Sequence, residues 1–145
     1  MNRKKASTVC PISNAVSHLG DRWSLLIIRD MMFMGKQNYT EFLESPEGIS
    51  TKILAQRLRA LEDEAIISKH RDLDNQSKNI YRLTEKGIDL MPIIVEMAIW
   101  STTHVNGVDI EAGHMNAIRQ DKAGFLKMAM GRLKDQLKTS QEVRA

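Results

Sequence analysis

The chain has 145 residues, of which 42% are hydrophobic and 27% are charged, a composition typical of a globular protein that buries a core of its own. Its net charge of +3 is modest, so any binding of nucleic acid requires local clustering of cations and not bulk charge. A single cysteine excludes an internal disulfide framework, and no apolar run reaches the length of a membrane span. These features predict a soluble, cytoplasmic protein without membrane association.

Two helices are predicted in the first quarter of the chain. Cys10-Pro11 opens the first helix, because proline is tolerated in a first turn, and Gly20 ends it. Its apolar stripe consists of Ile12, Val16 and Leu19. The second helix is predicted for residues 21–34 and stops at Gly35, and Trp23 is expected to anchor it in the core.

A short helix at 38–43 and a longer helix at 50–64, joined by a turn at 46–48, predict a helix-turn-helix. The spacing of the leucines in the longer helix places one side of it against a core, and Ser50 is expected to cap its first turn. No acid occurs between residues 48 and 61. The other side and its flanks carry small hydroxyls, an amide and cations, at Ser50, Thr51, Lys52, Gln56, Arg57 and Arg59.

These residue types suit the major groove of DNA. Lysine and arginine can meet phosphates, and glutamine or arginine can pair bidentately with the edges of adenine or guanine. The alternative interpretation of this stretch alone is an ordinary solvated helix face. The segments that precede and follow it favour the DNA-binding interpretation.

Behind this helix the apolar period changes from about 3.6 residues to 2, which predicts strands at 67–73 and 79–83 around a polar turn. A hairpin directly behind a helix-turn-helix is a wing, which can lie on a phosphate backbone or reach a minor groove. The wing cations are Lys69, Arg71, Lys78 and Arg82. The alternative is a surface hairpin with solvated lysines.

Thr84 is expected to cap a helix at 85–105, which carries too many apolar residues for one narrow stripe. In so small a domain, burial against another subunit is the simplest way to cover such a helix. Pro92 removes one helix hydrogen bond and is expected to kink the helix.

A break at 106–109 leads to a last helix, predicted from about residue 110 to 138, with a loose tail after Thr139. Three glycines weaken this helix, so it is expected to depend on packing against a partner. The chain therefore divides into a winged helix-turn-helix DNA-binding domain with a dimerisation helix at 1–105, and a C-terminal helical extension at 106–145.

With these residues in view, the chain resembles an HxlR-type winged helix-turn-helix transcriptional regulator, a group related to the MarR-type dimeric regulators. The matching residues run from Cys10 to about His104 and include Cys10-Pro11, 20–30, the Phe42 region, 49–54, 57–62, 81–87, Leu90, Pro92 and Trp100. The resemblance implies a mainly α fold with a small β-hairpin and with N- and C-terminal dimerisation helices. It also implies a homodimer whose reading helices enter successive major grooves of a palindromic operator, about 34–36 Å apart.

Three features depart from the family pattern. Ala65 stands where the family usually has a glycine before the wing, and the wing tip lacks the usual proline. The helical region after Gly107 is longer than the usual ending.

Cys10 is the candidate redox sensor, since it precedes a helix, where thiols are more reactive. In the resembling family a cysteine at this position can sense oxidants or electrophiles, in some members through an intersubunit disulfide. The alternative is a small apolar residue packed in a dimer interface. The four histidines show no i, i+4 spacing for a metal, and no phosphate loop or nucleophile elbow is present, so we expect no metal, no cofactor and no enzyme activity.

The sequence thus predicts a sequence-specific DNA-binding transcriptional regulator that acts as a homodimer on a palindromic operator. Repression is the expected mode, because the sequence contains no second domain to recruit polymerase. The expected partners are double-stranded DNA, a second copy of the chain, and a small-molecule or redox effector acting through Cys10. The alternative is a winged-helix module that binds an acidic protein without reading DNA sequence.

Overall fold

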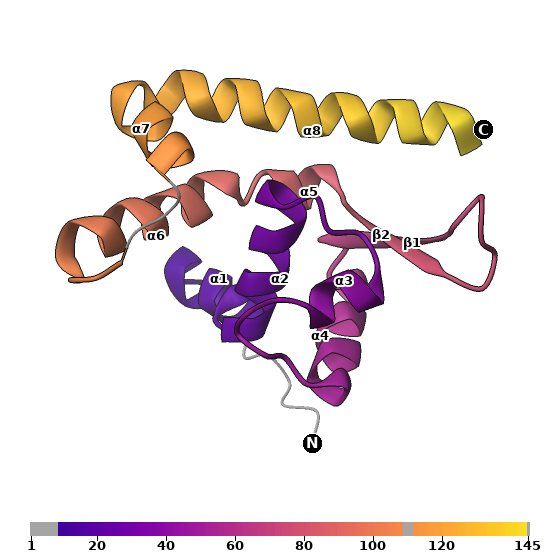
Figure 1. Cartoon of the computed structure of the whole chain (residues 1–145). Helices are drawn as coiled ribbons and strands as arrows, with labels where there is room; N and C mark the ends of the chain where they lie inside the picture. The colour runs from indigo at the N-terminus through magenta and orange to yellow at the C-terminus, as the bar shows by residue number, and fades with distance from the viewer. Residues whose placement is uncertain (1–8, 109–111, 145) are drawn as a thin grey trace. The chain divides into compact units, whose positions relative to one another are not determined.

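The computed structural model describes residues 9–108 and 112–144 (Figure 1). Its elements are α1 (Pro11–Leu19), α2 (Arg22–Phe33), α3 (Tyr39–Leu43), α4 (Thr51–Asp63), β1 (Ile67–Arg71), β2 (Asn79–Leu83), α5 (Glu85–Ile88), α6 (Met91–His104), α7 (Ala112–Gln120) and α8 (Lys122–Arg144). The mainly α fold with one small hairpin is confirmed. In the described ranges, none of these helices combines the length and the apolarity that a bilayer crossing requires.

The chain divides into two compact units, and the division along the sequence lies between Tyr81 and Arg82. The predicted division at residues 105 and 106 stays a prediction.

In the first unit α4 packs against α2, α3 and β1. The side of α4 that carries Leu54, Leu58 and Leu61 is buried, as its helical spacing predicts. The remaining buried apolar side chains of this core are Ile27, Ile28, Met31, Met32, Phe42, Ile49, Ile66, Ile67 and Tyr81. The helix α4 is therefore held by an apolar face that runs along most of its length.

The helix-turn-helix consists of α3, a turn and α4. Asn38 and Glu41 form a capping box at the start of α3, in which Glu41 N donates to Asn38 Oδ1 at 3.0 Å and Asn38 N donates to a Glu41 carboxylate oxygen at 3.1 Å. Gly48 has a φ of +72°, a conformation that glycine adopts without steric cost. Ser50 then caps α4, because its hydroxyl oxygen accepts a 3.2 Å hydrogen bond from Ile53 N.

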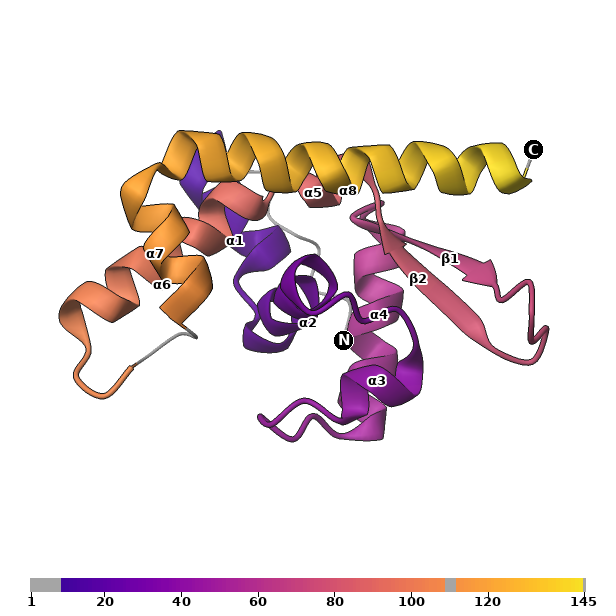
Figure 2. The same ribbon diagram turned by 45° about the horizontal axis from the view of Figure 1, so that its top comes forward.

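The wing is a two-stranded sheet of β1 and β2 (Figure 2). Its turn is closed by the 3.0 Å hydrogen bond from Asp72 N to the carbonyl oxygen of Lys78. Tyr81 N donates a 2.7 Å hydrogen bond to the carbonyl oxygen of Gln37, which connects β2 to the segment before α3. The strand therefore has a backbone partner directly before the helix-turn-helix.

Ala65 lies between α4 and β1 and adopts a φ of 55°. Among the described residues it is the one non-glycine residue with a positive φ. This is the position at which the resembling family usually has glycine. The turn therefore keeps the left-handed conformation although the residue is an alanine, and the alanine Cβ makes this conformation unfavourable.

In the second unit the expected single helix at 85–105 is wrong, because the chain forms α5 and α6 with a break at Asp89 and Leu90. Thr84 caps α5 as predicted, since Gly87 N donates to its hydroxyl at 3.2 Å. The expected kink at Pro92 is also wrong. Pro92 lies in the first turn of α6, where no amide hydrogen is needed, so the proline starts a helix.

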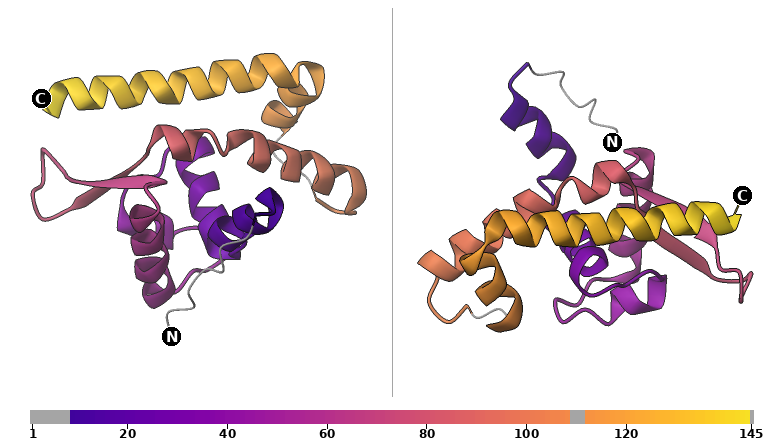
Figure 3. Two further views of the ribbon diagram at one scale, coloured as in Figure 1. Left: turned by 180° about the vertical axis from the view of Figure 1, so that it is seen from behind. Right: turned by 90° about the horizontal axis from the view of Figure 1, so that it is seen from above.

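The last predicted helix is likewise two helices, α7 and α8, and the residue expected to begin it lies outside the described residues. Asp121 separates the two helices, and its carboxylate accepts from Gly124 N at 2.9 Å in the manner of an N-cap. The tail after Thr139 was expected to be loose, but α8 continues to Arg144. Figure 3 shows α8 beside α5 and α6, which it contacts.

One expectation for the first helices needs correction, and the apolar stripe of α1 has an unusual exposure. Trp23 is only half-buried, and the Arg22 guanidinium lies 4.7 Å from its ring centroid, so it is not a core anchor. In α1 no residue is buried, and Ile12 and Val16 of the predicted stripe are 76% and 60% exposed. Two of the three stripe residues of α1 are therefore exposed in the single chain, while Leu19 is half-buried.

Candidate nucleic-acid interface

The solvent face of α4 carries three long polar side chains in one row. Lys52, Gln56 and Arg59 are separated by four and three residues, so they project from one side of the helix, and all three are exposed. Within the described part of the chain these side chains form no hydrogen bond or ion pair. Their donors and acceptors are consequently available to a partner.

The first turn of α4 adds two hydroxyls to this row. Ser50 and Thr51 are both exposed. The Ser50 oxygen is occupied as an acceptor by Ile53 N, whereas its own hydroxyl hydrogen can still be donated. The N-terminus of α4 is also the end at which the helix dipole favours an anion such as a phosphate.

Arg57 lies on a different side of α4. Its Nε is 3.3 Å from Asp21 Oδ2, and this carboxylate oxygen also accepts the 2.7 Å capping hydrogen bond from Ser24 N at the start of α2. Arg57 Nε is buried and has no hydrogen-bond partner among the described residues. Arg57 therefore joins α4 to α2 and does not share the row of Lys52, Gln56 and Arg59.

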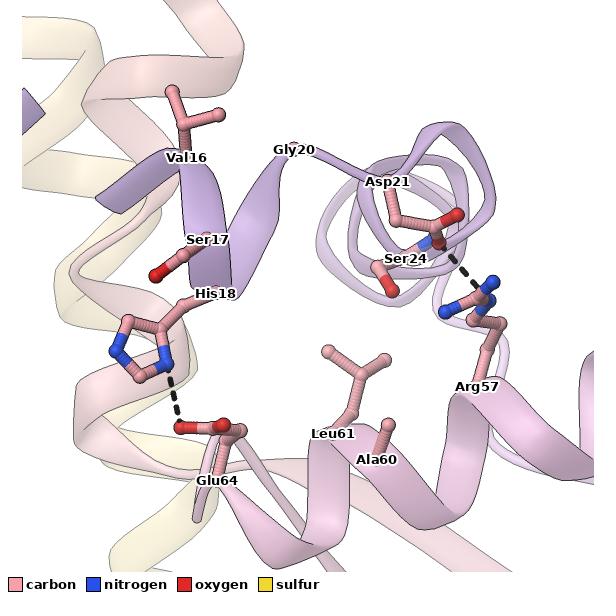
Figure 4. Close-up of a pocket in the computed structure, with 10 residues that line it drawn as sticks. All are labelled: Val16, Ser17, His18, Gly20, Asp21, Ser24, Arg57, Ala60, Leu61 and Glu64. Atoms are coloured by element: carbon pink, nitrogen blue, oxygen red, sulfur yellow. Dashed lines mark hydrogen bonds and ion pairs between the residues drawn. The ribbon is translucent and has the colours of Figure 1, made fainter. Parts of the chain in front are cut away.

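The Arg57 side chain lines a cavity of about 390 Å³, together with residues of α1 and α2 (Figure 4). On its far side His18 Nδ1 is 2.8 Å from Glu64 Oε2 at the C-cap of α4, so this contact and the ion pair of Arg57 with Asp21 connect α4 with the preceding helices. The apolar part of the lining includes Val16 and Leu61.

The wing carries its predicted cations in two environments. Lys69, Arg71 and Lys78 are exposed, and Arg71 Nη1 donates a 3.2 Å hydrogen bond to the carbonyl oxygen of Gln76 in the wing turn. Arg82 is half-buried at the base of β2. Burial, and then the charge of Arg144, lower the pKa of Arg82, so it is distinct from the three exposed cations.

A cluster of charged side chains, which the sequence interpretation missed, holds the turn between α3 and α4. Arg29 of α2 donates from Nη1 to Glu47 Oε1 at 2.5 Å and from Nη2 to Glu47 Oε2 at 3.1 Å, a forked pairing. Lys36 Nζ donates to Ser45 Oγ at 2.7 Å, and the Ser45 hydroxyl donates to Asp30. We call Arg29, Asp30, Lys36, Ser45 and Glu47 the turn brace.

The charges of the turn brace stabilise one another. The hydrogen bond from Arg29, opposed by burial, lowers the pKa of Glu47 from 4.5 to about 2. The hydrogen bond to Glu47 likewise raises the pKa of Arg29 above its ordinary value. Asp30 is only 2% exposed and is surrounded by Arg29 and Lys36, so its burial is compensated. The signal in the sequence that could have revealed the turn brace was Asp30, an acid at a helical position beside methionines that are buried.

Cys10 is the N-cap residue of α1 and is exposed. The carbonyl oxygen of Cys10 accepts a 2.9 Å hydrogen bond from Asn14 N in the first turn. In residues 9–108 and 112–144 no group of three or more acidic, histidine or cysteine side chains is arranged to hold a metal ion.

Comparison with known proteins places this geometry in a family. Residues 18–109 match the HxlR-like helix-turn-helix family. The HTH-type transcriptional regulator YodB of Bacillus subtilis is 40% identical over 96 residues, which cover 66% of this chain and 85% of YodB.

Solved structures agree with the sequence match. The reduced form of YodB superposes with a TM-score of 0.56 at 36% identity, covering 70% of this chain and 100% of YodB. A quinone-bound form of YodB gives a TM-score of 0.51 at 38% identity, covering 65% and 98%. The redox regulator HypR in its oxidized form gives a TM-score of 0.58 at 28% identity, covering 70% and 100%. The chain therefore belongs to the HxlR-like helix-turn-helix family and is a DNA-binding transcriptional regulator.

Proposed function

We propose that the chain is a repressor that binds a palindromic operator as a homodimer, and that its affinity for the operator changes when Cys10 reacts with an oxidant or electrophile. The observation that supports the DNA-reading part is the exposed row Lys52, Gln56 and Arg59 behind a capped helix start. In a winged helix-turn-helix this face enters the major groove, while exposed wing cations contact phosphates.

Uncovered apolar faces support the homodimer. Ile12 and Val16 lie one turn apart on α1 and are exposed. On α6, Ile93, Met97 and Trp100 follow the same helical spacing and are 44%, 48% and 62% exposed. Monomeric proteins seldom expose contiguous apolar rows of this kind, and a second copy of the chain offers identical faces to cover them.

The effector part rests on the exposure of Cys10 and on the relatives. YodB has been solved in a quinone-bound form, and HypR is described as a redox regulator. For a quinone, the Cys10 sulfur would add to a ring carbon and the thiol proton would pass to the reduced ring, which yields a hydroquinone thioether. For a two-electron oxidant such as diamide, two Cys10 thiols of a dimer would lose two electrons and two protons and form one disulfide.

Selection of bound duplexes from a random DNA pool tests the DNA-reading proposal. Enrichment of a palindrome with half-sites about 34–36 Å apart would support a symmetric dimer. Failure to enrich any sequence would favour the protein-interaction module. Sedimentation of the free protein would report the dimer independently of DNA.

The effector proposal is tested on the selected operator. Diamide or a benzoquinone is expected to change operator affinity of the wild type, whereas Cys10→Ser should bind the operator equally with and without the reagent. A reporter driven by the operator should be expressed more strongly in cells without the protein if the protein represses. Lower expression in those cells would contradict repression.

A further inference from the structure

The turn between α3 and α4 is fixed from two sides by the turn brace. Arg29 donates hydrogen bonds from two nitrogens to the Glu47 carboxylate, at 2.5 Å and 3.1 Å. Ser45, two residues earlier, is bonded both to Lys36 and to Asp30. The Gly48 amide also donates to the carbonyl oxygen of Ser45 at 3.0 Å, so the turn is closed upon itself.

The turn brace includes a buried residue of α2. Asp30 is 2% exposed, and it accepts from Arg29 Nη2 at 2.6 Å and from Arg29 Nε at 2.9 Å. The Arg29 guanidinium is therefore oriented by Asp30 on one side and by Glu47 on the other. A planar fork held by two carboxylates has little freedom to rotate, unlike a solvated surface ion pair.

Glu47 lies three residues before Ser50, the N-cap of α4. A displacement of Glu47 therefore passes through Gly48 and Ile49 directly to the first turn of the reading helix. The exposed hydroxyls and cations of that turn have to match base edges to within the tolerance of a hydrogen bond, a few tenths of an ångström in a distance of about 2.9 Å.

We propose that Arg29 and Glu47 are positioning residues for sequence reading. Their ion pair sets the place of the first turn of α4 relative to α2, and operator discrimination depends on it through Ser50, Thr51 and Lys52. This inference rests on the proposed function, since it presupposes that α4 reads an operator.

Glu47→Gln tests the inference, because it keeps the shape of the side chain and removes the charge that Arg29 binds. Glu44→Gln is the matched control, since Glu44 is exposed in the same turn and the same unit of charge is removed. The affinity ratio between the selected operator and an operator with one changed base pair is expected to fall about tenfold in Glu47→Gln and to stay unchanged in Glu44→Gln. Affinity for a duplex without the motif should rise equally in both variants.

Arg29→Lys is the second variant, which keeps the charge but lacks the fork. It is also expected to lower the ratio, and it keeps the inference testable if Glu47→Gln does not fold. Amide hydrogen exchange gives a readout without DNA: the amides of residues 48–53 should exchange faster in either variant, while those of Leu58 and Leu61 stay protected.

The outcomes distinguish a failure of the proposed function from a failure of the positioning role. A wild type that prefers no sequence overturns the proposed function. A wild type that discriminates, together with folded variants that discriminate equally well, overturns the positioning role alone. An equal loss of affinity on all sequences overturns it too, because a phosphate contact or a general loss of stability would then account for the effect.

Discussion

The Tyr39 hydroxyl donates a 2.7 Å hydrogen bond to the carbonyl oxygen of Thr51 and so joins the first residue of α3 to the first residue of α4. Tyr39→Phe removes this bond with almost no change of shape. Because the bond is solvent-accessible, we expect the free energy of unfolding to fall by about 0.5–1 kcal/mol. Urea denaturation measures this. An unchanged midpoint and slope would show that water replaces the tyrosine without loss.

Gln56→Ala is expected to relax sequence preference at one or two positions of each half-site, at a cost of about 1–3 kcal/mol on the cognate operator. The physical reason is the loss of an amide that can pair bidentately with adenine. Competition binding against single-base operator variants measures the change, with Gln136→Ala of α8 as the control. An equal loss on every duplex would mean that Gln56 does not read a base.

Lys78→Ala should weaken binding on all sequences and reduce the slope of log K against log salt by about one unit for each bound protomer. Lys78 is exposed in the wing turn directly before β2, and its backbone forms hydrogen bonds with Asp72 and Asn75. Lys127→Ala, an exposed lysine on α8, should leave the slope as it is. A slope that does not change in Lys78→Ala would remove the wing tip from the phosphate contacts.

Ala65→Gly is expected to raise the free energy of unfolding by about 0.5–1 kcal/mol. The left-handed φ of 55° is unfavourable for alanine by about 1–2 kcal/mol, and the greater freedom of glycine in the unfolded chain offsets part of the gain. Thermal and urea unfolding measure the change. Ala55→Gly, at an exposed position within α4, should lower stability by about 0.5–1 kcal/mol instead. A loss of stability in Ala65→Gly would show that other contacts of the Cβ outweigh the backbone effect.

The turn brace predicts that the free energy of unfolding decreases in acid. Arg29 lowers the pKa of Glu47 from 4.5 in its ordinary state to about 2 in the folded protein. A depressed carboxyl pKa stabilises the fold above the unfolded value, and the contribution is lost as the pH falls from about 4.5 through 2. The stability difference between the wild type and Glu47→Gln should therefore be constant from pH 7 to 5 and shrink below.

Unfolding of both proteins in urea between pH 2 and pH 7 measures this difference. The same comparison in an Arg29→Gln background is the control, because the cause of the shift is then absent and the acid dependence should be lost. A difference that stays constant down to pH 2 would contradict the ion pair as its origin.

The sequence was sufficient for the elements that depend on local rules. The leucine spacing of α4, its Ser50 cap and the change of period into the wing each predicted the observed structure. Where two local rules competed, it was insufficient. Pro92 can kink a helix or begin one, and the distinction depends on whether residues 89 and 90 stay helical, which is decided by packing.

The candidate interface was predictable by residue type but not by direction. Arg57 and Arg59 look alike in a run of cations, yet Arg57 turns to Asp21, thirty-six positions earlier, whereas Arg59 faces solvent. The turn brace escaped prediction for the same reason, since its forked pair joins residues 29 and 47. Pairs so distant in the chain leave no periodic signal, because periodicity reports only which side of one element is dry.

The exposed row on α4 has a consequence for evolution and for protein engineering. Lys52, Gln56 and Arg59 make no hydrogen bond or ion pair with other described residues, so their replacement removes no polar contact that the fold uses. Helix stability would change only by the small differences in propensity between the new and the old side chains. A library randomised at these three positions should therefore remain folded in most members while its preferred operators diverge, which allows the recognised sequence to drift while the scaffold is retained.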